Sequence, residues 1–398
     1  MEDGRTGTGL QRRTDTFYQY LESSQINPAI IPSVDLQFIC STDYQALQTC
    51  LLYCNLNEIS VIGQIKFQRS PGKYFSVLFY VIDNWIANSV DFCAAFLLAD
   101  AGYDVWMGNL RGSAYSRKHR TWSPENSKFW DFSMDEYAIK DLPAMMDYIL
   151  DATNRSSLSY IGISLGTTIS TILLSNRTDY NSKLNLVVHL APVTFFKTPN
   201  LARKILSIAA DLLEGPFKAF EILPRNRLIY SFVELVCLAN SAMLEFCLFF
   251  VDTIVGKDRE QLDMPPNFLL KIAQLYPAGC SAKVFFHYFQ FIRTGEFGYF
   301  DHKNDKTNLR YYGQTKAPAY NLTNIVAPMA FFKAPNDPLS TLEDDLALIS
   351  KLPVNRTLYY EIVRWKNFNH IDFIVAKDVK KFVYNRLFEI LSDINKFP

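Results

Sequence analysis

The chain has 398 residues, of which 40 are Lys or Arg and 40 are Asp or Glu, so its formal net charge is zero. Hydrophobic residues make up 49% of the chain, which excludes an intrinsically disordered protein. With no surplus of positive charge to neutralise phosphates, nucleic acid is not an expected partner. The length corresponds to one large domain or to a domain with a sizeable insertion.

No signal peptide and no membrane-spanning segment is predicted. The first 26 residues are polar and charged, whereas a signal peptide contains a continuous apolar stretch. The most apolar segment, residues 229–255, is interrupted by Glu234, Glu245 and Asp252, so it falls short of the roughly 20 apolar residues that cross a bilayer. The pattern predicts instead a pair of helices that are buried or face lipid.

Cysteines and glycosylation sequons leave the cellular compartment undecided. The seven cysteines are scattered and lack the C-x-x-C spacing of metal sites, so no metal is expected. Their odd number leaves at least one free thiol. Four N-x-S/T sequons, which serve as N-glycan acceptors in secreted proteins, begin at Asn154, Asn176, Asn321 and Asn355.

From about Lys66 onward, short apolar runs alternate with amphipathic stretches, which is typical of βα units around a parallel sheet. Buried strands are predicted at residues 75–82, 103–107, 158–161, 184–189, 329–332 and 358–363. Between the second and third strands, Ser133 and Glu136 have the spacing of a capping box that opens a helix. A second amphipathic helix is predicted near the C-terminus, over residues 379–394.

Residues 195–312 interrupt this βα rhythm. They are rich in Leu, Phe and Ala and contain six prolines, which predicts several helices and no strand. Such a block between two strands of an α/β core is most simply a cap, or lid. The predicted organisation is therefore a poorly assigned N-terminal segment (1–60), a core (61–194 and 313–398) and a helical cap (195–312).

The clearest catalytic signal follows the third predicted strand. There the chain reads Gly162-Ile163-Ser164-Leu165-Gly166, the pattern G-x-S-x-G, and a helix is predicted directly after it. In this motif a tight strand-to-helix turn exposes the serine, and the glycines leave room that a Cβ would occupy. Ser164 is thus the predicted nucleophile. The backbone N–H of Leu165, at the helix N-terminus, is a predicted donor to an oxyanion.

A nucleophilic serine needs a base to take its proton and a carboxylate to orient that base, in the chain order Ser, acid, His. Of the five histidines, His370 alone has the expected position after the last predicted strand. Asp337 follows the strand at 329–332 and is the predicted acid, although an Asx-turn before Pro338 would also explain it. Asp372 competes for the acid role, but its closeness to His370 in sequence favours a local hydrogen bond.

Several stretches carry a family resemblance, among them residues 98–106 (LADAGYDVW), 108–112 (GNLRG), 129–133 (FWDFS), 190–193 (LAPV) and 369–374 (NHIDFI). They resemble the acid lipases, the α/β-hydrolase group that contains gastric lipase and lysosomal acid lipase. The resemblance implies an α/β-hydrolase fold with a mostly parallel sheet and an inserted helical cap. It implies no cofactor and the same triad of Ser164, Asp337 and His370. It also implies a disulfide between Cys237 and Cys247.

The chain departs from the family pattern around the oxyanion site. The usual G-H-S-Q-G reads G-I-S-L-G here, a change that keeps the N–H of Leu165 available. The family's H-G-L-L segment, source of the second oxyanion donor, is not recognisable, because residues 77–83 run straight into Asn84-Trp85. Loss of one such donor typically lowers the rate by about 10²- to 10³-fold.

These observations predict a lipase that hydrolyses carboxylic esters of neutral lipids, either triacylglycerols or sterol esters, at a lipid interface and in lipid catabolism. A monomer is expected, and the family implies a secreted or lysosomal glycoprotein. One alternative is a catalytically impaired, lipase-like protein that binds lipid without turnover, because the H-G-L-L segment is missing. Another is a different serine hydrolase, such as a carboxylesterase or an acyltransferase.

Overall fold

The computed structural model describes most of the chain from residue 93 to residue 394 and three strands before it. Its described ranges are 50–54, 62–67, 76–80, 93–114, 116–213, 219–224, 227–262, 269, 273, 278–354 and 358–394. All of them belong to one compact unit, Phe38–Pro398. The segment from 81 to 92, where the second oxyanion donor is expected, lies outside the described residues, as does the sequon at Asn355.

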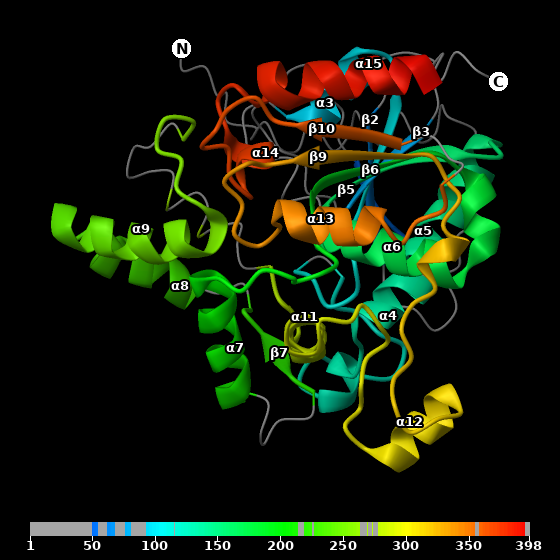
Figure 1. The fold of residues 1–398 in the computed structure, drawn as a ribbon, viewed down its shortest axis with the longest axis horizontal. Helices are drawn as coiled ribbons and strands as arrows, with labels where there is room; N and C mark the ends of the chain where they lie inside the picture. Colours follow the sequence, from blue (N-terminus) through cyan, green and yellow to red (C-terminus); the bar gives the residue numbers. More distant parts are fainter. Residues whose placement is uncertain are drawn as a thin grey trace, which may run out of the picture. The chain divides into compact units, whose positions relative to one another are not determined.

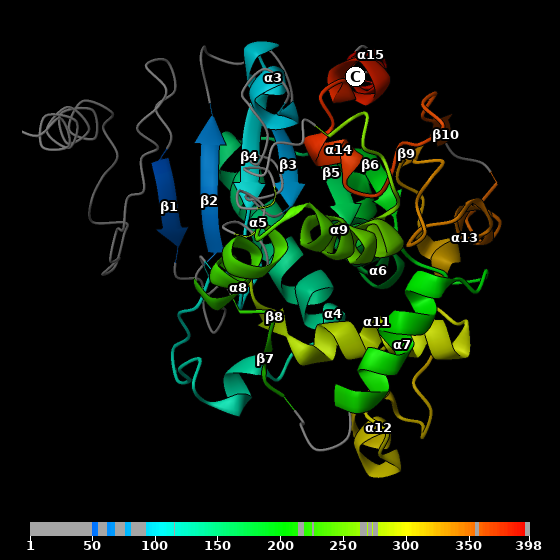
Figure 2. The same ribbon diagram turned by 90° about the vertical axis from the view of Figure 1, so that its left-hand side faces the viewer.

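An eight-stranded sheet lies at the centre of this unit (Figures 1 and 2). Its strand order is β1-β2-β4-β3-β5-β6-β9-β10. The strands are β1 (Cys50–Cys54), β2 (Ile62–Phe67), β3 (Ser76–Tyr80), β4 (Asp104–Gly108), β5 (Leu158–Ser164), β6 (Leu184–Pro192), β9 (Met329–Lys333) and β10 (Leu358–Ile362). β2 pairs antiparallel with both β1 and β4, and the other neighbours are parallel. The prediction of a mostly parallel sheet is confirmed.

All six predicted strands are present, with ends that differ by a few residues. The two strands that the sequence did not predict, β1 and β2, form one edge of the sheet. In β2 the polar residues Gln64 and Lys66 alternate with apolar ones. Strands of this mixed kind suit an antiparallel edge and lack the continuous apolar run of a buried parallel strand. The segment 1–60, which had no assignable pattern, therefore contains at least the strand β1.

Helices cover both faces of the sheet, as a parallel sheet requires. The helices that pack on it are α3 (Ala94–Asp100) and α15 (Asn385–Ile394) on one face, and α5 (Leu142–Thr153), α6 (Leu165–Asn176) and α13 (Leu342–Ile349) on the other. Neighbouring strand residues point to opposite faces. In β5, Tyr160 packs with the α5 and α6 side, and Ile161 packs with the α3 and α15 side.

The predicted capping box is confirmed at the start of α4 (Met134–Glu136). The Ser133 N–H donates to Glu136 Oε2 over 2.8 Å, and the Ser133 side chain accepts a backbone N–H in return. The helix then continues through a wider turn, Tyr137–Asp141, into α5. The C-terminal helix is also confirmed. It has the same wider turn at Lys380–Tyr384 before α15, and the short helix α14 (Asp372–Val375) precedes it.

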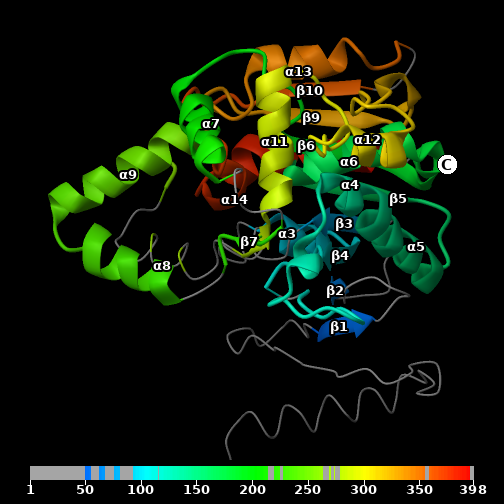
Figure 3. The ribbon, with the colours of Figure 1, turned by 90° about the horizontal axis from the view of Figure 1, so that it is seen from below.

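Between β6 and β9 the chain forms several helices: α7 (Leu201–Leu213), α8 (Arg227–Phe232), α9 (Ser241–Val255), α11 (Ala282–Thr294) and α12 (Asp305–Tyr312). Figure 3 shows α8 and α9 side by side, projecting away from the sheet. The prediction that this block has no strand is wrong. β7 (Glu221–Ile222) pairs antiparallel with β8 (Cys280–Ser281), and strands of two residues are too short to give a periodic signal.

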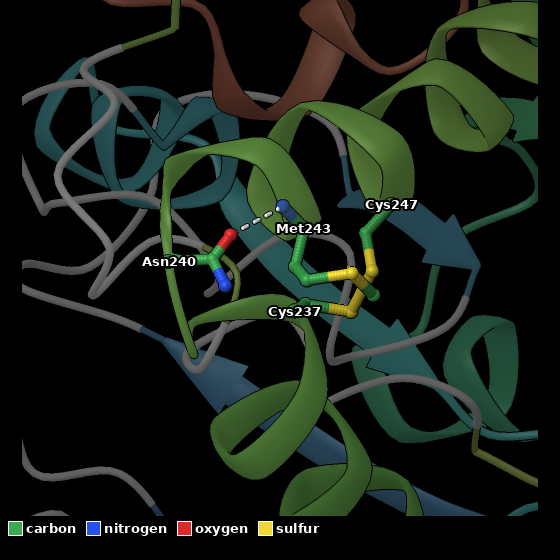
Figure 4. Close-up of a disulfide and its surroundings, with 4 residues drawn as sticks. All are labelled: Cys237, Asn240, Met243 and Cys247. Atoms are coloured by element: carbon green, nitrogen blue, oxygen red, sulfur yellow. Dashed lines mark hydrogen bonds between the residues drawn. A yellow bond between two sulfur atoms is a disulfide. The ribbon is translucent and has the colours of Figure 1, made fainter.

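The apolar segment 229–255 forms a helix pair, as predicted. A disulfide joins Cys237, at the end of a wider turn after α8, to Cys247 in α9, with 5.7 Å between the Cα atoms (Figure 4). This is the pairing that the family resemblance implies. Asn240 is the N-cap of α9, and its side chain accepts the N–H of Met243 over 3.0 Å. Over the described ranges, no helix combines the length and apolarity that a membrane span requires.

Candidate active site

Ser164 lies at the sharp turn between β5 and α6. Its φ of +50° is a conformation that residues with a Cβ rarely adopt, and such strain is concentrated at functional sites. A Cβ at Gly162 would lie 2.8 Å from the carbonyl carbon of Gly166, so the two ends of the turn approach too closely for any other residue. The Tyr160 hydroxyl donates to the Gly166 carbonyl over 2.8 Å. The turn is therefore held by glycine at one end and by a buried tyrosine beneath it.

The structure brings the three predicted residues into one hydrogen-bonded series. Ser164 Oγ lies 2.9 Å from His370 Nε2, and His370 Nδ1 lies 2.7 Å from Asp337 Oδ2. Asp337 comes from the loop after β9, and His370 comes from the loop before α14. Both side chains are buried. This order of contacts lets the imidazole take the serine proton at Nε2 while the carboxylate holds Nδ1–H.

Asp337 also makes the turn that its sequence position predicts. Its second oxygen, Oδ1, accepts the backbone N–H groups of Leu339 over 2.8 Å and Ser340 over 3.1 Å. The two explanations for this residue are thus compatible, because one carboxylate oxygen fixes the loop while the other faces His370. Hydrogen bonds from N–H groups keep a carboxylate oriented without adding charge.

Asp372, the competing acid, bonds locally. Its Oδ2 accepts the N–H of Asn369 over 2.7 Å. Burial raises the pKa of Asp372 to about 8, and the nearby carboxyl of Asp258 raises it in the same direction. A carboxyl group in this state is neutral at pH 7 and is poorly suited to stabilise an imidazolium ion.

The other four histidines have partners elsewhere. His119 Nδ1 accepts the backbone N–H groups of residues 121 and 122. His189 lies in β6 with Nε2 at 2.9 Å from Ser170 Oγ. His287 Nε2 lies 2.9 Å from the Gly298 carbonyl, and His302 stacks on a tyrosine ring.

Two threonines at the start of α6 tie the serine turn to the rest of the core, and sequence reasoning gave them no role. The Thr167 hydroxyl donates to the Ser164 carbonyl over 2.6 Å and accepts the N–H of Val193 over 2.9 Å. The Thr168 hydroxyl donates to the Val193 carbonyl over 2.5 Å and lies 2.7 Å from the Tyr288 hydroxyl. Apart from the bond to Ser164, these contacts join residues 25 to 120 positions apart, which explains why no local pattern marks them.

Leu165 is the first residue of α6. The N–H groups of the first helical turn have no acceptor within their own helix. Leu165 N–H, at this first position, stays the predicted donor to the oxyanion. In the ranges that the structure covers, no group of three or more His, Cys, Asp or Glu side chains could hold a metal ion.

A mostly parallel sheet with a serine at a strained strand-to-helix turn defines the α/β-hydrolase class. Residues 82–374 match the family model described as alpha/beta hydrolase fold. The chain is 34% identical over 324 residues to gastric triacylglycerol lipase of Bos taurus, which covers 79% of this chain and 77% of that protein. It is 31% identical over 311 residues to lipase member K of Homo sapiens, covering 78% and 76%.

Two solved structures share the fold at low sequence identity. One is a putative lipase from Sulfolobus solfataricus, with a TM-score of 0.52 and 14% identity over 88% of this chain and 99% of that chain. The other is a soluble variant of monoglyceride lipase from Saccharomyces cerevisiae, with a TM-score of 0.51 and 14% identity over 90% and 99%. The chain belongs to the acid lipase family of α/β-hydrolases and is a serine hydrolase that acts on ester bonds.

Proposed function

We propose that the chain is a lipase that hydrolyses the ester bonds of neutral lipids, triacylglycerols or sterol esters, in lipid catabolism. The observation that carries the proposal is the series from Ser164 through His370 to Asp337. Ser164 Oγ attacks the acyl carbonyl while His370 Nε2 takes its proton, and His370 then gives that proton to the leaving alcohol. His370 next activates a water molecule, which cleaves the acyl-enzyme and releases the fatty acid.

The acid and the helix N-terminus stabilise the charges that develop in this reaction. Asp337 keeps Nδ1–H of the imidazole in place and stabilises the imidazolium ion. Leu165 N–H donates to the oxyanion of the tetrahedral intermediate, aided by the dipole of α6. No cofactor takes part in these steps.

The helices between β6 and β9 act as the cap in this proposal. Large apolar side chains of the α8–α9 pair and of the turn that joins the two helices are exposed, including Leu235 at 72% in the turn and Phe249 at 59% in α9. Exposed apolar clusters of this kind mark contact with a partner or a membrane. On a lipase, such a surface suits the droplet or micelle that holds the substrate.

We also propose that the protein enters the secretory pathway and is a monomer. A disulfide such as Cys237–Cys247 persists in oxidising compartments. The sequon residues Asn154 and Asn321 are exposed and open to glycosylation. Asn176 is a poor acceptor, because its Oδ1 accepts the Tyr299 hydroxyl over 2.5 Å and its Nδ2 is buried.

The first test is covalent labelling by a fluorophosphonate, with Ser164→Ala as the control. Labelling of the wild type, its loss in the variant, and release of fatty acid from a triacylglycerol or sterol ester emulsion are the expected results. Folded wild-type protein that is not labelled would overturn the proposal.

The missing H-G-L-L segment favours a second candidate, a lipid-binding protein without turnover. This candidate predicts saturable binding of a fluorescent fatty-acyl lipid with no release of alcohol or fatty acid. Hydrolysis of a short-chain ester by the same preparation would exclude it.

A further inference from the structure

The last residue of α9 and the two residues after it contact both catalytic loops. We call residues 255–257 the strap. The Val255 carbonyl accepts the backbone N–H of His370 over 3.0 Å, and the Gly256 carbonyl accepts Asn369 Nδ2 over 3.0 Å. The Lys257 carbonyl accepts Asn336 Nδ2 over 2.9 Å. Three consecutive carbonyl groups thus bond to the base itself and to the residues that precede the base and the acid.

The strap packs closely against both loops at Gly256. Gly256 has a φ of +94°, which disfavours any residue with a side chain. A Cβ at this position would lie 2.0 Å from the Asn336 carbonyl oxygen and 2.9 Å from the Asn369 Cβ. Both contacts are closer than real Cβ atoms show, so the glycine allows the strap to reach both loops at once.

The two asparagines link the strap to the catalytic pair. Asn369 is buried, and while its Nδ2 donates to the strap its Oδ1 accepts the N–H groups of Ile371 and Asp372 over 3.0 and 3.1 Å. This fixes the backbone on either side of His370. The Asn336 N–H donates to the Phe368 carbonyl over 2.9 Å, which joins the acid loop to the base loop.

The cap also holds the acid loop from its other end, at the start of α7. Asn200 Nδ2 donates to the Pro338 carbonyl over 2.7 Å. The guanidinium of Arg203 donates to the Leu339 carbonyl over 3.3 Å and pairs with the buried carboxylate of Asp344. The loop that carries Asp337 is therefore bonded to the cap on both sides of the acid.

We propose that the strap is a positioning element for the triad and that Asn336 and Asn369 are positioning residues. The strap sets the separation of His370 from Asp337, so this separation depends on where α9 ends. The inference rests on the proposed function, in which the triad performs ester hydrolysis. Its consequence is that displacement of α9 changes the chemistry as well as access to the site.

The test removes the donors to the strap without adding charge. In Asn369→Ser the hydroxyl can still accept the N–H two residues onward, as in an ST-turn, but it offers no amide donor to Gly256. Asn336→Ala removes the donor to Lys257. The matched control is Asn240→Ala, which removes the N-cap at the opposite end of α9 (Figure 4). A lost N-cap destabilises a helix by roughly 1 kcal/mol.

Two measurements separate positioning from mere stability. The first is kcat and KM for a soluble short-chain ester. We expect Asn369→Ser and Asn336→Ala each to lower kcat by about 10- to 100-fold with little change in KM, since small misplacements of catalytic groups have effects of this size. The second is the deshielded proton resonance of His370 Nδ1–H, which we expect to shift or broaden. Asn240→Ala is expected to lower Tm and to leave both readouts close to wild type.

Unchanged kcat and an unchanged His370 resonance in both Asn369→Ser and Asn336→Ala would overturn the inference. If Asn369→Ser does not fold, the half-buried Asn336 supplies the same test through Asn336→Ala. If the wild type hydrolyses no ester, the proposed function fails, and the His370 resonance still decides whether the strap positions the imidazole.

Discussion

The triad loops and the α8–α9 pair meet at the strap, yet they are built in contrasting ways. Asp337 and His370 are buried, and the two oxygens of Asp337 have separate partners. The α8–α9 pair instead exposes Phe246 and Phe249 to solvent and is joined within itself by a disulfide. The contrast is between a buried site whose hydrogen bonds fix its distances and an apolar surface that faces solvent.

Among the variants that test the buried site against the exposed surface, Asp337→Asn is expected to have the largest effect, which is on kcat. The amide oxygen can still accept the two N–H groups of the turn, but an amide donor toward His370 Nδ1 selects the wrong tautomer. We expect kcat to fall by about 10⁴-fold near neutral pH with the fold retained. Asp372→Asn, in the same region, is the control, and a comparable loss there would contradict the assignment of the acid.

A smaller effect is expected for Thr167→Val. This change removes the hydroxyl between the Ser164 carbonyl and the Val193 N–H and leaves both buried groups without that partner. Each unpaired buried group costs about 1–3 kcal/mol, so the loss of both partners should lower the free energy of unfolding by about 2–6 kcal/mol. Because the turn loosens, fluorophosphonate labelling should also slow by about 10-fold. Thr167→Ser should restore both values.

The exposed surface is tested by Phe249→Ser. The side chain is 59% exposed, so its loss should change the packing of the protein little. Withdrawal of one phenyl ring from a lipid surface costs on the order of 1.5 kcal/mol, or about 10-fold in binding to emulsion droplets. Co-sedimentation with triacylglycerol droplets measures this binding. Equal binding by the variant and the wild type would remove this helix face from the proposed lipid contact.

The smallest effect concerns pH and Asp372. Burial raises the pKa of Asp372 to about 8 from an ordinary value near 3.8, so the folded state favours the protonated carboxyl. The stability that this proton contributes is complete below about pH 4 and is lost as the pH rises through 8. Asp372→Asn keeps a neutral group, so its Tm should exceed that of the wild type by several degrees at pH 9 and by less at pH 5. A difference that does not vary with pH would contradict this prediction.

The sequence predicted the parts of the fold and site that depend on local pattern. A buried parallel strand such as β9 has a continuous apolar run, Met-Ala-Phe-Phe, and Ser164 stands in a motif whose glycines are required by the turn. The order of the chain then pointed to Asp337 and His370. The strands β1 and β2 were not predicted, because an antiparallel strand that mixes polar and apolar residues has a weaker signal than a continuous apolar run.

The strap could not be predicted in this way. It acts through backbone carbonyl groups, which every residue carries, and Asn369 lies 113 positions from its partner Gly256. An asparagine before a histidine has no distinguishing pattern, and a glycine after a helix is an ordinary helix end. The contact arises only when the cap folds back onto the two loops, which is a property of the tertiary structure.

The length of α9 has a mechanical consequence. The helix has 15 residues, and at 1.5 Å per residue it is a rigid arm of about 22 Å. The Cys237–Cys247 disulfide joins the turn after α8 to the middle of this helix, and the last residue of the helix, Val255, begins the strap. A tilt of about 5° about the strap would move the far end by roughly 2 Å while the strap carbonyls shift by only tenths of an ångström. A large displacement of the far end of α9 thus corresponds to a much smaller displacement of the strap beside the imidazole.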